Sequence, residues 1–250
     1  MGNLLEGKTA IITGARRGIG KATCQLFAEN GANIYACLRK ADAEFDLWTE
    51  YLEREHGVFV KPVYFDVANV EEIKKGMKEI FSDKNPIDVL VNNAGIASAG
   101  TLRMTPIETL KNVFDINYFA PIVIMQIVAG KMMRQRRGSI INIASVGGVE
   151  AQPGYLAYGS SKAALIWATR SISKELGNFN VRVNAVAPGQ TNTDMGGVYK
   201  SSEEMANTIQ RTALHRMAEP NEIANTILFL ASDLASFVTG EIMQVDGGRV

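Results

Sequence analysis

The stretch that decides the fold is TGARRGIG, residues Thr13 to Gly20. It follows a short apolar run and precedes a segment in which Ala22, Leu26 and Phe27 share one helical stripe. Gly31 stands where the C-terminal cap of that helix belongs. Because glycine adopts backbone conformations that are closed to other residues, this pattern predicts a tight turn from a strand into a helix.

The same alternation of strand and helix continues along the 250 residues, 46% of which are hydrophobic. Several β-branched runs are apolar without alternation, as expected for strands covered on both faces. The expected strands are Lys8–Thr13, Asn33–Leu38, Val60–Phe65, Val89–Asn92, Ser139–Ile143, Val181–Val186 and Ile242–Val245. Such alternation is typical of doubly wound sheets. We therefore predict one α/β domain over residues 1–250, with a Rossmann-like, seven-stranded parallel sheet.

The composition argues against several classes of protein. The 26 basic and 26 acidic residues balance, so there is no electrostatic case for binding nucleic acid. The longest apolar runs, such as Phe119 to Met125, are too short to cross a bilayer, and the first residues do not resemble a secretion signal. Cys24 and Cys37 lie in apolar contexts, which favours buried free thiols in a reducing cytoplasm. The short apolar runs also predict no membrane partner. His56 and His215 are isolated, so no metal site is expected.

The glycine turn has the spacing G-x-x-x-G-x-G, formed by Gly14, Gly18 and Gly20. This differs from the G-x-G-x-x-G fingerprint of many dinucleotide-binding proteins. The physical role is the same, because a turn without side chains lets a pyrophosphate approach the backbone amides at a helix N-terminus. Taken alone, the turn is also compatible with a tight connection that binds no ligand.

Further motifs follow the later strands. They are Asn92-Asn93-Ala94-Gly95, Ser145, Tyr158-Gly159-Ser160-Ser161-Lys162 and Pro188-Gly189. With the glycine turn, this set resembles the classical short-chain dehydrogenases/reductases over nearly the whole chain, from Lys8 to Gly248. Within that family the chain most resembles the bacterial 3-oxoacyl-carrier-protein reductases. The segments that carry this resemblance are Met132-Met133, Arg136-Arg137-Gly138, Pro188 to Met195, Glu222-Ile223-Ala224 and Phe229 to Asp233. These segments also occur in reductases of sugars, alcohols and steroids.

Tyr158 and Lys162 lie four residues apart on an expected helix and therefore share a face. A neighbouring ammonium favours the phenolate, so we expect Lys162 to lower the pKa of Tyr158 from its usual value of about 10. The resemblance implies that Tyr158 protonates a carbonyl oxygen and that Lys162 also holds the nicotinamide ribose. It further implies that Ser145 orients the substrate and that Asn117 holds a water in a proton relay. Separately, each residue also has an ordinary structural explanation.

The resemblance implies NADP(H) as the cofactor. Where NAD-binding relatives carry an aspartate, at the end of the second strand, this chain has Leu38 followed by Arg39. We expect Arg39 and Arg17 to clamp a 2′-phosphate, with Arg16 assisting, because an arginine fork binds phosphate in a bidentate way. The alternative is that all three are solvated surface charges. The complete set of implied contacts is Gly14, Arg16, Arg17, Gly18, Ile19, Gly20, Arg39, Asp66, Val67, Asn93, Ala94, Gly95, Tyr158, Lys162, Pro188, Gly189, Thr191 and Thr193.

These patterns predict an NADPH-dependent reductase that converts a ketone, expected to be a 3-oxoacyl thioester, into a secondary alcohol. One alternative is a dehydrogenase of a sugar or a secondary alcohol. Another is a nucleotide-sensing regulator without turnover, against which the retained Tyr158 and Lys162 argue. A substrate lid is expected near residues 190–216, where four apolar residues either line a pocket or pack in the core. These four are Met195, Val198, Tyr199 and Met205.

Two further expectations concern partners. Apolar residues beyond what one sheet face needs indicate subunit contacts, and the examples are Ile122, Met125, Leu165 and Trp167. The resemblance implies a homotetramer, with a dimer as the alternative. Four cations end a helix before Gly138, and they are Lys131, Arg134, Arg136 and Arg137. This basic cluster either docks an acidic acyl carrier protein or complements the helix dipole. Against docking, Phe179 stands where related reductases carry a second basic residue.

Overall fold

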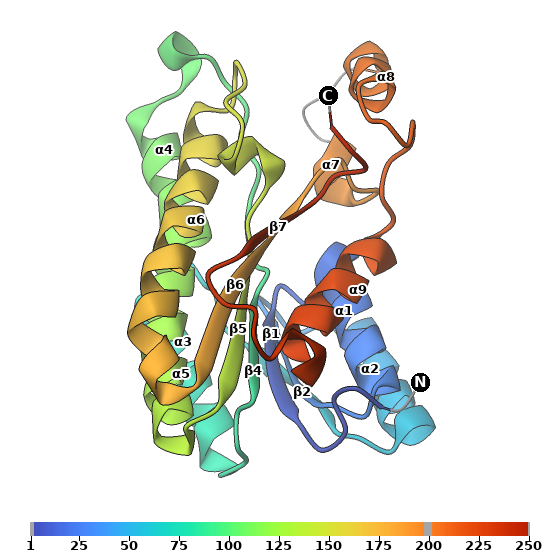
Figure 1. Ribbon diagram of the computed structural model, residues 1–250, viewed down its shortest axis with the longest axis vertical. Helices are drawn as coiled ribbons and strands as arrows, with labels where there is room; N and C mark the ends of the chain where they lie inside the picture. Colours follow the sequence, from blue (N-terminus) through green and yellow to red (C-terminus); the bar gives the residue numbers. More distant parts are fainter. Residues whose placement is uncertain (1–2, 198–201, 250) are drawn as a thin grey trace.

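The computed structural model describes residues 3–197 and 202–249, and in this part of the chain seven strands form one parallel sheet. The strands are β1 (Thr9–Thr13), β2 (Asn33–Leu38), β3 (Val60–Tyr64), β4 (Val89–Asn92), β5 (Gly138–Ile143), β6 (Val181–Pro188) and β7 (Ile242–Val245). Their order is β3-β2-β1-β4-β5-β6-β7 (Figure 1). The order reverses between β1 and β4, so the carboxyl ends of these strands form the switch point. The predicted doubly wound parallel sheet is confirmed.

Helices cover both faces of the sheet (Figure 1). On one face lie α1 (Gly18–Glu29), α2 (Ala43–His56) and α9 (Pro220–Ala231). On the other lie α3 (Val70–Ser82), α5 (Ala120–Gln135) and α6 (Leu156–Leu176). The shorter helices are α4 (Ile107–Phe114), α7 (Asp194–Gly197) and α8 (Ser202–Gln210). The central strands are apolar on both sides because a separate hydrophobic cluster packs against each face.

The strand boundaries follow the expected ones to within two residues. The largest difference is at β6, which continues to Pro188 because its register with β7 extends to the pair Pro188 and Val245. Helix α4 begins at Ile107, directly after Pro106, which keeps an extended ψ of 147° and is the N-cap residue. The four-residue helix α7 and helix α8 lie in the predicted lid region, and two of its expected residues, Val198 and Tyr199, fall outside the described residues.

The helical stretch 107–135 runs through α4, a π-helical turn at Asp115–Phe119 and α5. By length and composition it could span a membrane, with a mean hydropathy of 1.5, but 44% of its most apolar part is buried inside the protein. Two of the residues expected to face a subunit partner, Met125 and Leu165, belong to the core. Their apolar character is therefore explained by packing against the sheet, a correction to the sequence-based expectation.

Candidate active site

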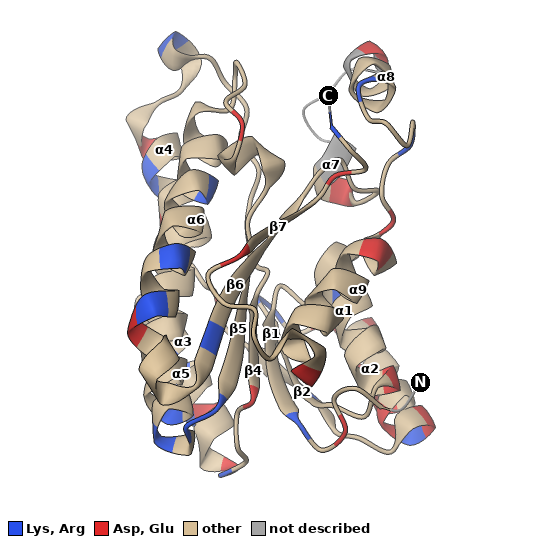
Figure 2. Cartoon of the chain, viewed as in Figure 1, with Lys and Arg blue, Asp and Glu red and all other residues tan. Residues whose placement is uncertain are grey.

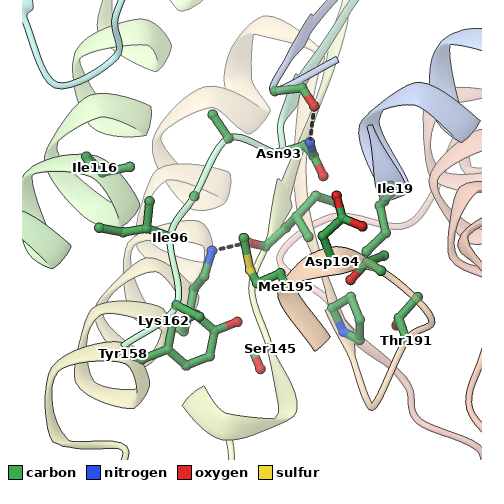
Figure 3. A pocket seen from close by; sticks show the side chains of 18 of the residues that line it. Ile19, Asn93, Ile96, Ile116, Ser145, Tyr158, Lys162, Thr191, Asp194 and Met195 are labelled. Carbon is green, nitrogen blue, oxygen red and sulfur yellow. Dashed lines mark hydrogen bonds between the residues drawn. The ribbon is translucent and has the colours of Figure 1, made fainter. Parts of the chain in front are cut away.

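A cavity of about 690 Å³ opens at the carboxyl ends of the strands. This is the edge of a doubly wound sheet where ligands bind, and the volume suits a sizeable small molecule. The predicted catalytic residues Ser145, Tyr158 and Lys162 all line it, as do the predicted cofactor contacts other than Gly20. Figure 3 shows Tyr158, Lys162 and Ser145 facing Met195 across this space. Asn117 does not line the cavity.

The glycine turn brings backbone close to the cavity. Gly14 and Gly18 have φ angles of +67° and +55°, which side-chain-bearing residues rarely adopt. Gly20 lies behind the turn, where a Cβ atom would stand 2.2 Å from the Gly14 carbonyl oxygen. Its role is therefore to let α1 pack against the turn, and it makes no wall of the cavity. The N-cap residue of α1 is Arg17, whose guanidinium has no acceptor atom and makes no capping bond. The Arg17 side chain therefore leaves the first-turn amides of this helix open to an anion.

Thr13 and Asn93 tie the turn to the end of β4, a contact that the motif analysis did not identify. The Asn93 side-chain amide donates to the carbonyl oxygens of Thr13 (3.0 Å) and Gly14 (3.1 Å). In return, the Thr13 hydroxyl oxygen accepts from the backbone amides of Asn93 and Ala94, both at 3.0 Å. The polar residues after β4 therefore fix the shape of the glycine turn.

Lys162 and Tyr158 lie side by side at the deep end of the cavity, on α6. The Lys162 Nζ atom is 5.9 Å from the centroid of the Tyr158 ring and donates to the Ile143 carbonyl oxygen at 2.7 Å. Burial lowers the pKa of Lys162 to about 8. Burial also raises the pKa of Tyr158, an effect that the Ser145 hydroxyl partly offsets. The net pKa shift of Tyr158 is therefore upward, opposite to the expected direction, because desolvation of the phenol dominates.

Ser145 follows β5 and is nearly buried, 9% exposed. Its Oγ atom accepts from the Gly147 amide at 3.1 Å and thereby caps a short 3-10 turn. A hydroxyl oxygen can accept one bond and still donate another, so this contact leaves the hydroxyl proton available. Together with Tyr158, Ser145 therefore presents two hydroxyl groups to the same part of the cavity.

Asn117 sits in the π-helical turn, a feature that often marks functional sites. Its Oδ1 atom accepts from the Ile96 amide at 2.8 Å, and its Nδ2 atom donates to the Ile96 carbonyl at 2.9 Å. A third bond joins Nδ2 to the Ser161 hydroxyl at 3.1 Å, on the helix that carries Tyr158 and Lys162. In this structure the side chain fastens the cavity-lining segment after β4 to α6.

The three predicted phosphate-binding arginines differ in their surroundings. Arg16 pairs with Asp42, which caps α2, and Arg17 pairs with Asp194 at the start of α7; both pairs measure 2.5 Å. The Arg16 guanidinium holds the pKa of Asp42 below its usual range. Arg39 is exposed, lines the cavity and has no hydrogen-bond or ion-pair partner within residues 3–197 and 202–249. Asp42 therefore anchors a basic residue rather than replacing the missing strand acid.

These features fit a nicotinamide dinucleotide. The positive φ angles of Gly14 and Gly18 favour glycine, so no side chain stands where a pyrophosphate would pass. Gly95 is also tightly packed, because a Cβ atom there would stand 3.1 Å from Asn117 Oδ1. Asp66 and Val67 line the cavity after β3, beside Arg39 after β2. Pro188, Gly189, Thr191 and Thr193 line its other wall after β6. The cavity thus runs from a free guanidinium at one end to the tyrosine–lysine pair at the other.

Other cavity residues were missed by sequence analysis, because no motif marks them. They include Ile96, Ile116, Gln152, Tyr155, Thr208 and Arg249. Arg249 is separated from Tyr158 by 91 positions in the sequence, and only the path of the chain after β7 brings it to this wall.

The basic cluster lies elsewhere. Figure 2 shows its blue segments at the end of α5, opposite to α7 and α8. Arg137 donates to Asp88 at 2.8 Å, and Arg136 donates to the Asn178 carbonyl at 3.1 Å. Lys131 lies 4.8 Å from the centre of the Phe81 ring. Phe179 packs against the core cluster beneath these residues. Within one chain, the cluster and the cavity are therefore at opposite edges of the sheet.

The fold and the cavity define an oxidoreductase-type dinucleotide-binding domain. Comparison with known proteins shows to which family this domain belongs. A family model described as enoyl-(acyl carrier protein) reductase matches residues 14–249. The 3-oxoacyl-[acyl-carrier-protein] reductase FabG of Thermotoga maritima is 40% identical over 249 residues, which are 98% of this chain and 99% of the relative. The chain belongs to the short-chain dehydrogenase/reductase family.

Two solved structures share the fold closely. A protein of Beutenbergia cavernae, described as an NAD(P)-dependent gluconate 5-dehydrogenase with bound NADP at low occupancy, has a TM-score of 0.92 and 30% identity, covering 99% of this chain and 98% of its own. A 7α-hydroxysteroid dehydrogenase complexed with NADH and 7-oxoglycochenodeoxycholic acid has a TM-score of 0.91 and 32% identity, covering 99% and 96%. The family is thus shared by proteins of different substrates and cofactors.

Proposed function

We propose that this chain reduces a ketone to a secondary alcohol with NADPH. The observation that supports this most directly is the convergence of Tyr158, Ser145 and Lys162 at one end of a cavity whose other end carries the unpaired Arg39. When bound, the nicotinamide supplies the hydride. The protein's own residues then have to bind the ketone, orient it and provide a proton.

Tyr158 donates its hydroxyl proton to the carbonyl oxygen as charge develops there. Ser145 donates a second hydrogen bond to the same oxygen, which orients the ketone and stabilises that charge. Lys162 stabilises the resulting tyrosinate, because its ammonium lies beside the ring. Burial of both groups strengthens this interaction, since the surrounding dielectric is low.

NADPH is the preferred form of the cofactor. Leu38 offers no carboxylate to a ribose 2′-hydroxyl, whereas Arg39 offers a free guanidinium to a 2′-phosphate. The two structural neighbours named above were solved with different cofactors, NADP in one and NADH in the other. The choice for this chain therefore rests on its own residues at the end of β2.

Two classes of ketone are candidates. The identity to FabG favours a 3-oxoacyl thioester, free or on an acyl carrier protein. The likeness to a gluconate 5-dehydrogenase favours a sugar acid or another secondary alcohol. A panel of 3-oxoacyl thioesters, keto sugars, cyclic ketones and an enoyl thioester, with NADPH oxidation followed at 340 nm as a general nicotinamide signal, tests the proposal. Failure of every ketone to oxidise NADPH would favour a regulator that only binds nucleotide.

The assembly is a homotetramer. Large apolar side chains remain exposed in two parts of the described chain: Phe119 and Trp167 (70% exposed) in the π-helical turn and α6, and Leu234 and Phe237 before β7. A tetramer with D₂ symmetry covers two such parts, because it contains more than one kind of two-fold interface. Light scattering at micromolar concentration tests this, and a monomer would contradict it.

In the lid segment, the described residues 190–197 and 202–216 close over the substrate, and Met195 lines the cavity. Limited proteolysis with and without NADPH tests this movement.

We further propose a cytoplasmic location, in line with the buried free thiols of Cys24 and Cys37.

A further inference from the structure

The segment after β7 returns to the cavity and is fastened there. The backbone amides of Ala213 and Leu214 donate to the carbonyls of Gly248 (2.9 Å) and Gly247 (3.1 Å), and Thr212 forms a bridge with Arg249. The Arg249 side chain is only 20% exposed and lines the same cavity as Tyr158. A charged side chain held against the reacting end of a cavity is a candidate for recognising a ligand.

The protein leaves this guanidinium only partly satisfied. With the Gln152 amide oriented oxygen inward, Oε1 accepts from Nη1 at 2.9 Å and from Nη2 at 2.5 Å. Nε lies 3.3 Å from Glu150 Oε2, on a side chain that is 56% exposed. A guanidinium has five donors, and the other two have no partner within the described residues. Its nearest buried partner is thus a neutral oxygen, and its acid partner is solvated.

Contacts connect this group to the proposed proton donor. The backbone carbonyl of Gln152 accepts from the backbone amide of Tyr155 at 3.2 Å. The ring centroids of Tyr155 and Tyr158 are 6.0 Å apart. The acids that line the described cavity are Asp66, at the far end with Arg39, and Asp194, which pairs with Arg17. No acid other than the exposed Glu150 is shown to pair with Arg249 in the described structure. An anion carried by the substrate would therefore meet a positive charge there.

We infer that Arg249 and Gln152 form a carboxylate-binding subsite, and that the physiological substrate is a keto acid whose carboxylate pairs with Arg249 while its ketone reaches Tyr158. A carboxylate matches the planar guanidinium in a bidentate way, whereas a thioester carries no charge at this point. The inference rests on the proposed ketone reduction and selects, between its two candidate classes, the one that bears an acid. It concerns substrate choice only, since Arg249 touches none of the reacting atoms.

The test compares acids with their own esters. We would measure kcat/KM with NADPH for 3-oxobutanoate, 4-oxopentanoate and 5-oxohexanoate, and for the methyl ester of each, so that the separation of ketone and carboxylate varies. The unmodified protein should prefer at least one acid to its ester by tenfold or more. In Arg249→Met this acid-to-ester ratio should fall at least tenfold, and in Arg249→Lys it should fall less, because the charge remains and the fork is lost.

A matched control removes the same charge nearby. Arg211 lies at the end of α8, is exposed and does not line the cavity, so Arg211→Met should leave the ratio within twofold. Glu150→Gln removes the solvated acid beside Nε and should raise the ratio. An unmodified protein that reduces every ester as well as its acid overturns the inference. So does an Arg249→Met variant that loses acid and ester reduction equally, which would make Arg249 a tether for the chain end.

Binding separates this inference from the proposed reaction. Calorimetric titration with 4-oxopentanoate and its methyl ester, in the presence of NADP⁺, requires no turnover. If no ketone is reduced but the acid binds at least tenfold more tightly than the ester, and only when Arg249 is present, the subsite stands and the proposed reaction fails. Equal or absent binding of acid and ester, together with the absence of an acid preference in turnover, overturns the subsite.

Discussion

Arginines gather at both edges of the sheet, but their partners differ. At the amino edge, Arg137 meets the nearly buried Asp88, and Arg182 donates to the Leu230 carbonyl at 2.8 Å. At the carboxyl edge, Arg39 has no partner within the described residues, and Arg249 meets a neutral amide oxygen and the exposed acid Glu150. Arg137 and Arg182 are satisfied by the fold, whereas Arg39 and Arg249 have donors left for a ligand. What separates a structural arginine from a binding one is thus its set of partners.

The same contrast holds for the other polar groups of the two edges. Asp88 at the amino edge accepts from the Thr9 amide (3.0 Å) and from Arg137, so both of its oxygens are used inside the protein. At the carboxyl edge Lys162 is buried and Tyr158 is half-buried, and desolvation shifts the pKa of each toward its uncharged form. Substitutions at the amino edge should therefore cost stability, and substitutions at the carboxyl edge should cost activity.

The largest effect is expected at Tyr158. Tyr158→Phe removes the proton donor and should lower kcat by about a thousandfold or more, equivalent to about 4 kcal/mol of transition-state stabilisation. NADPH binding, measured by fluorescence titration, should stay within threefold of the unmodified protein because only one hydroxyl is lost. Substantial residual turnover would show that another residue supplies the proton.

The next largest effect concerns cofactor choice. Arg39→Asp removes a free guanidinium and places a carboxylate where the 2′-phosphate is expected, so the preference for NADPH over NADH should fall by about a hundredfold. The preference is measured as the ratio of kcat/KM values for the two cofactors with one ketone. As a control, Arg54→Asp on α2, outside the cavity, should leave the ratio unchanged. Equal use of both cofactors by the unmodified protein would contradict the interpretation of this edge.

At the amino edge the effect should be on stability. Asp88→Ala leaves the buried Thr9 amide without its acceptor and should lower the free energy of unfolding by about 2 kcal/mol. Asp88→Asn can keep that acceptor but gives up the charge and the second acceptor oxygen that face the exposed Arg137, so it should cost less, about 0.5 kcal/mol. Denaturant titration distinguishes the two. Equal losses in both variants would mean that the ion pair, rather than the backbone contact, holds this edge.

A smaller effect is expected from pH. Burial lowers the pKa of Lys162 to about 8, so its ammonium is lost as the pH rises through that value. If the ammonium stabilises the tyrosinate, kcat/KM should fall about tenfold per pH unit above pH 8. The folded protein binds fewer protons than the unfolded chain between about pH 8 and 10.5, so this group's contribution to stability rises with pH in that window. A flat rate profile up to pH 10 would remove Lys162 from the proposed mechanism.

Much of the carboxyl edge could be predicted from the sequence, but two of its features could not. The strands, their parallel order and the cavity-lining motifs follow from local patterns, because strand ends and glycine turns are set by residues adjacent in sequence. Arg249 could not be predicted, since its position depends on a path that closes only in the folded chain. The direction of the Tyr158 pKa shift was missed for the same reason, because desolvation depends on burial rather than on spacing.

The sequence does not decide whether the basic cluster binds a partner or is satisfied by the fold, because a run of cations has the same pattern in both cases. The structure shows Arg137 bound to Asp88 and Arg136 bound to Asn178, which leaves Arg134 as an exposed member with no structural partner within the described residues. The cluster also lies at the C-terminal end of α5, a 16-residue helix about 24 Å long, and so at the opposite edge of the sheet from the cavity. A carrier protein docked there would lie far from the cavity of the same chain.

The smallest effect is therefore expected at Arg134. Arg134→Glu should leave kcat/KM on a pantetheine thioester within twofold and lower kcat/KM on the same acyl group attached to carrier protein by about threefold at low salt, because the carrier is acidic. The difference should disappear as salt screens the charges. Arg54→Glu, on the opposite face of the sheet, is the matched control and should affect neither substrate. Equal efficiency on both substrates at every salt concentration would make the cluster a solvated helix end whose cations complement the α5 dipole.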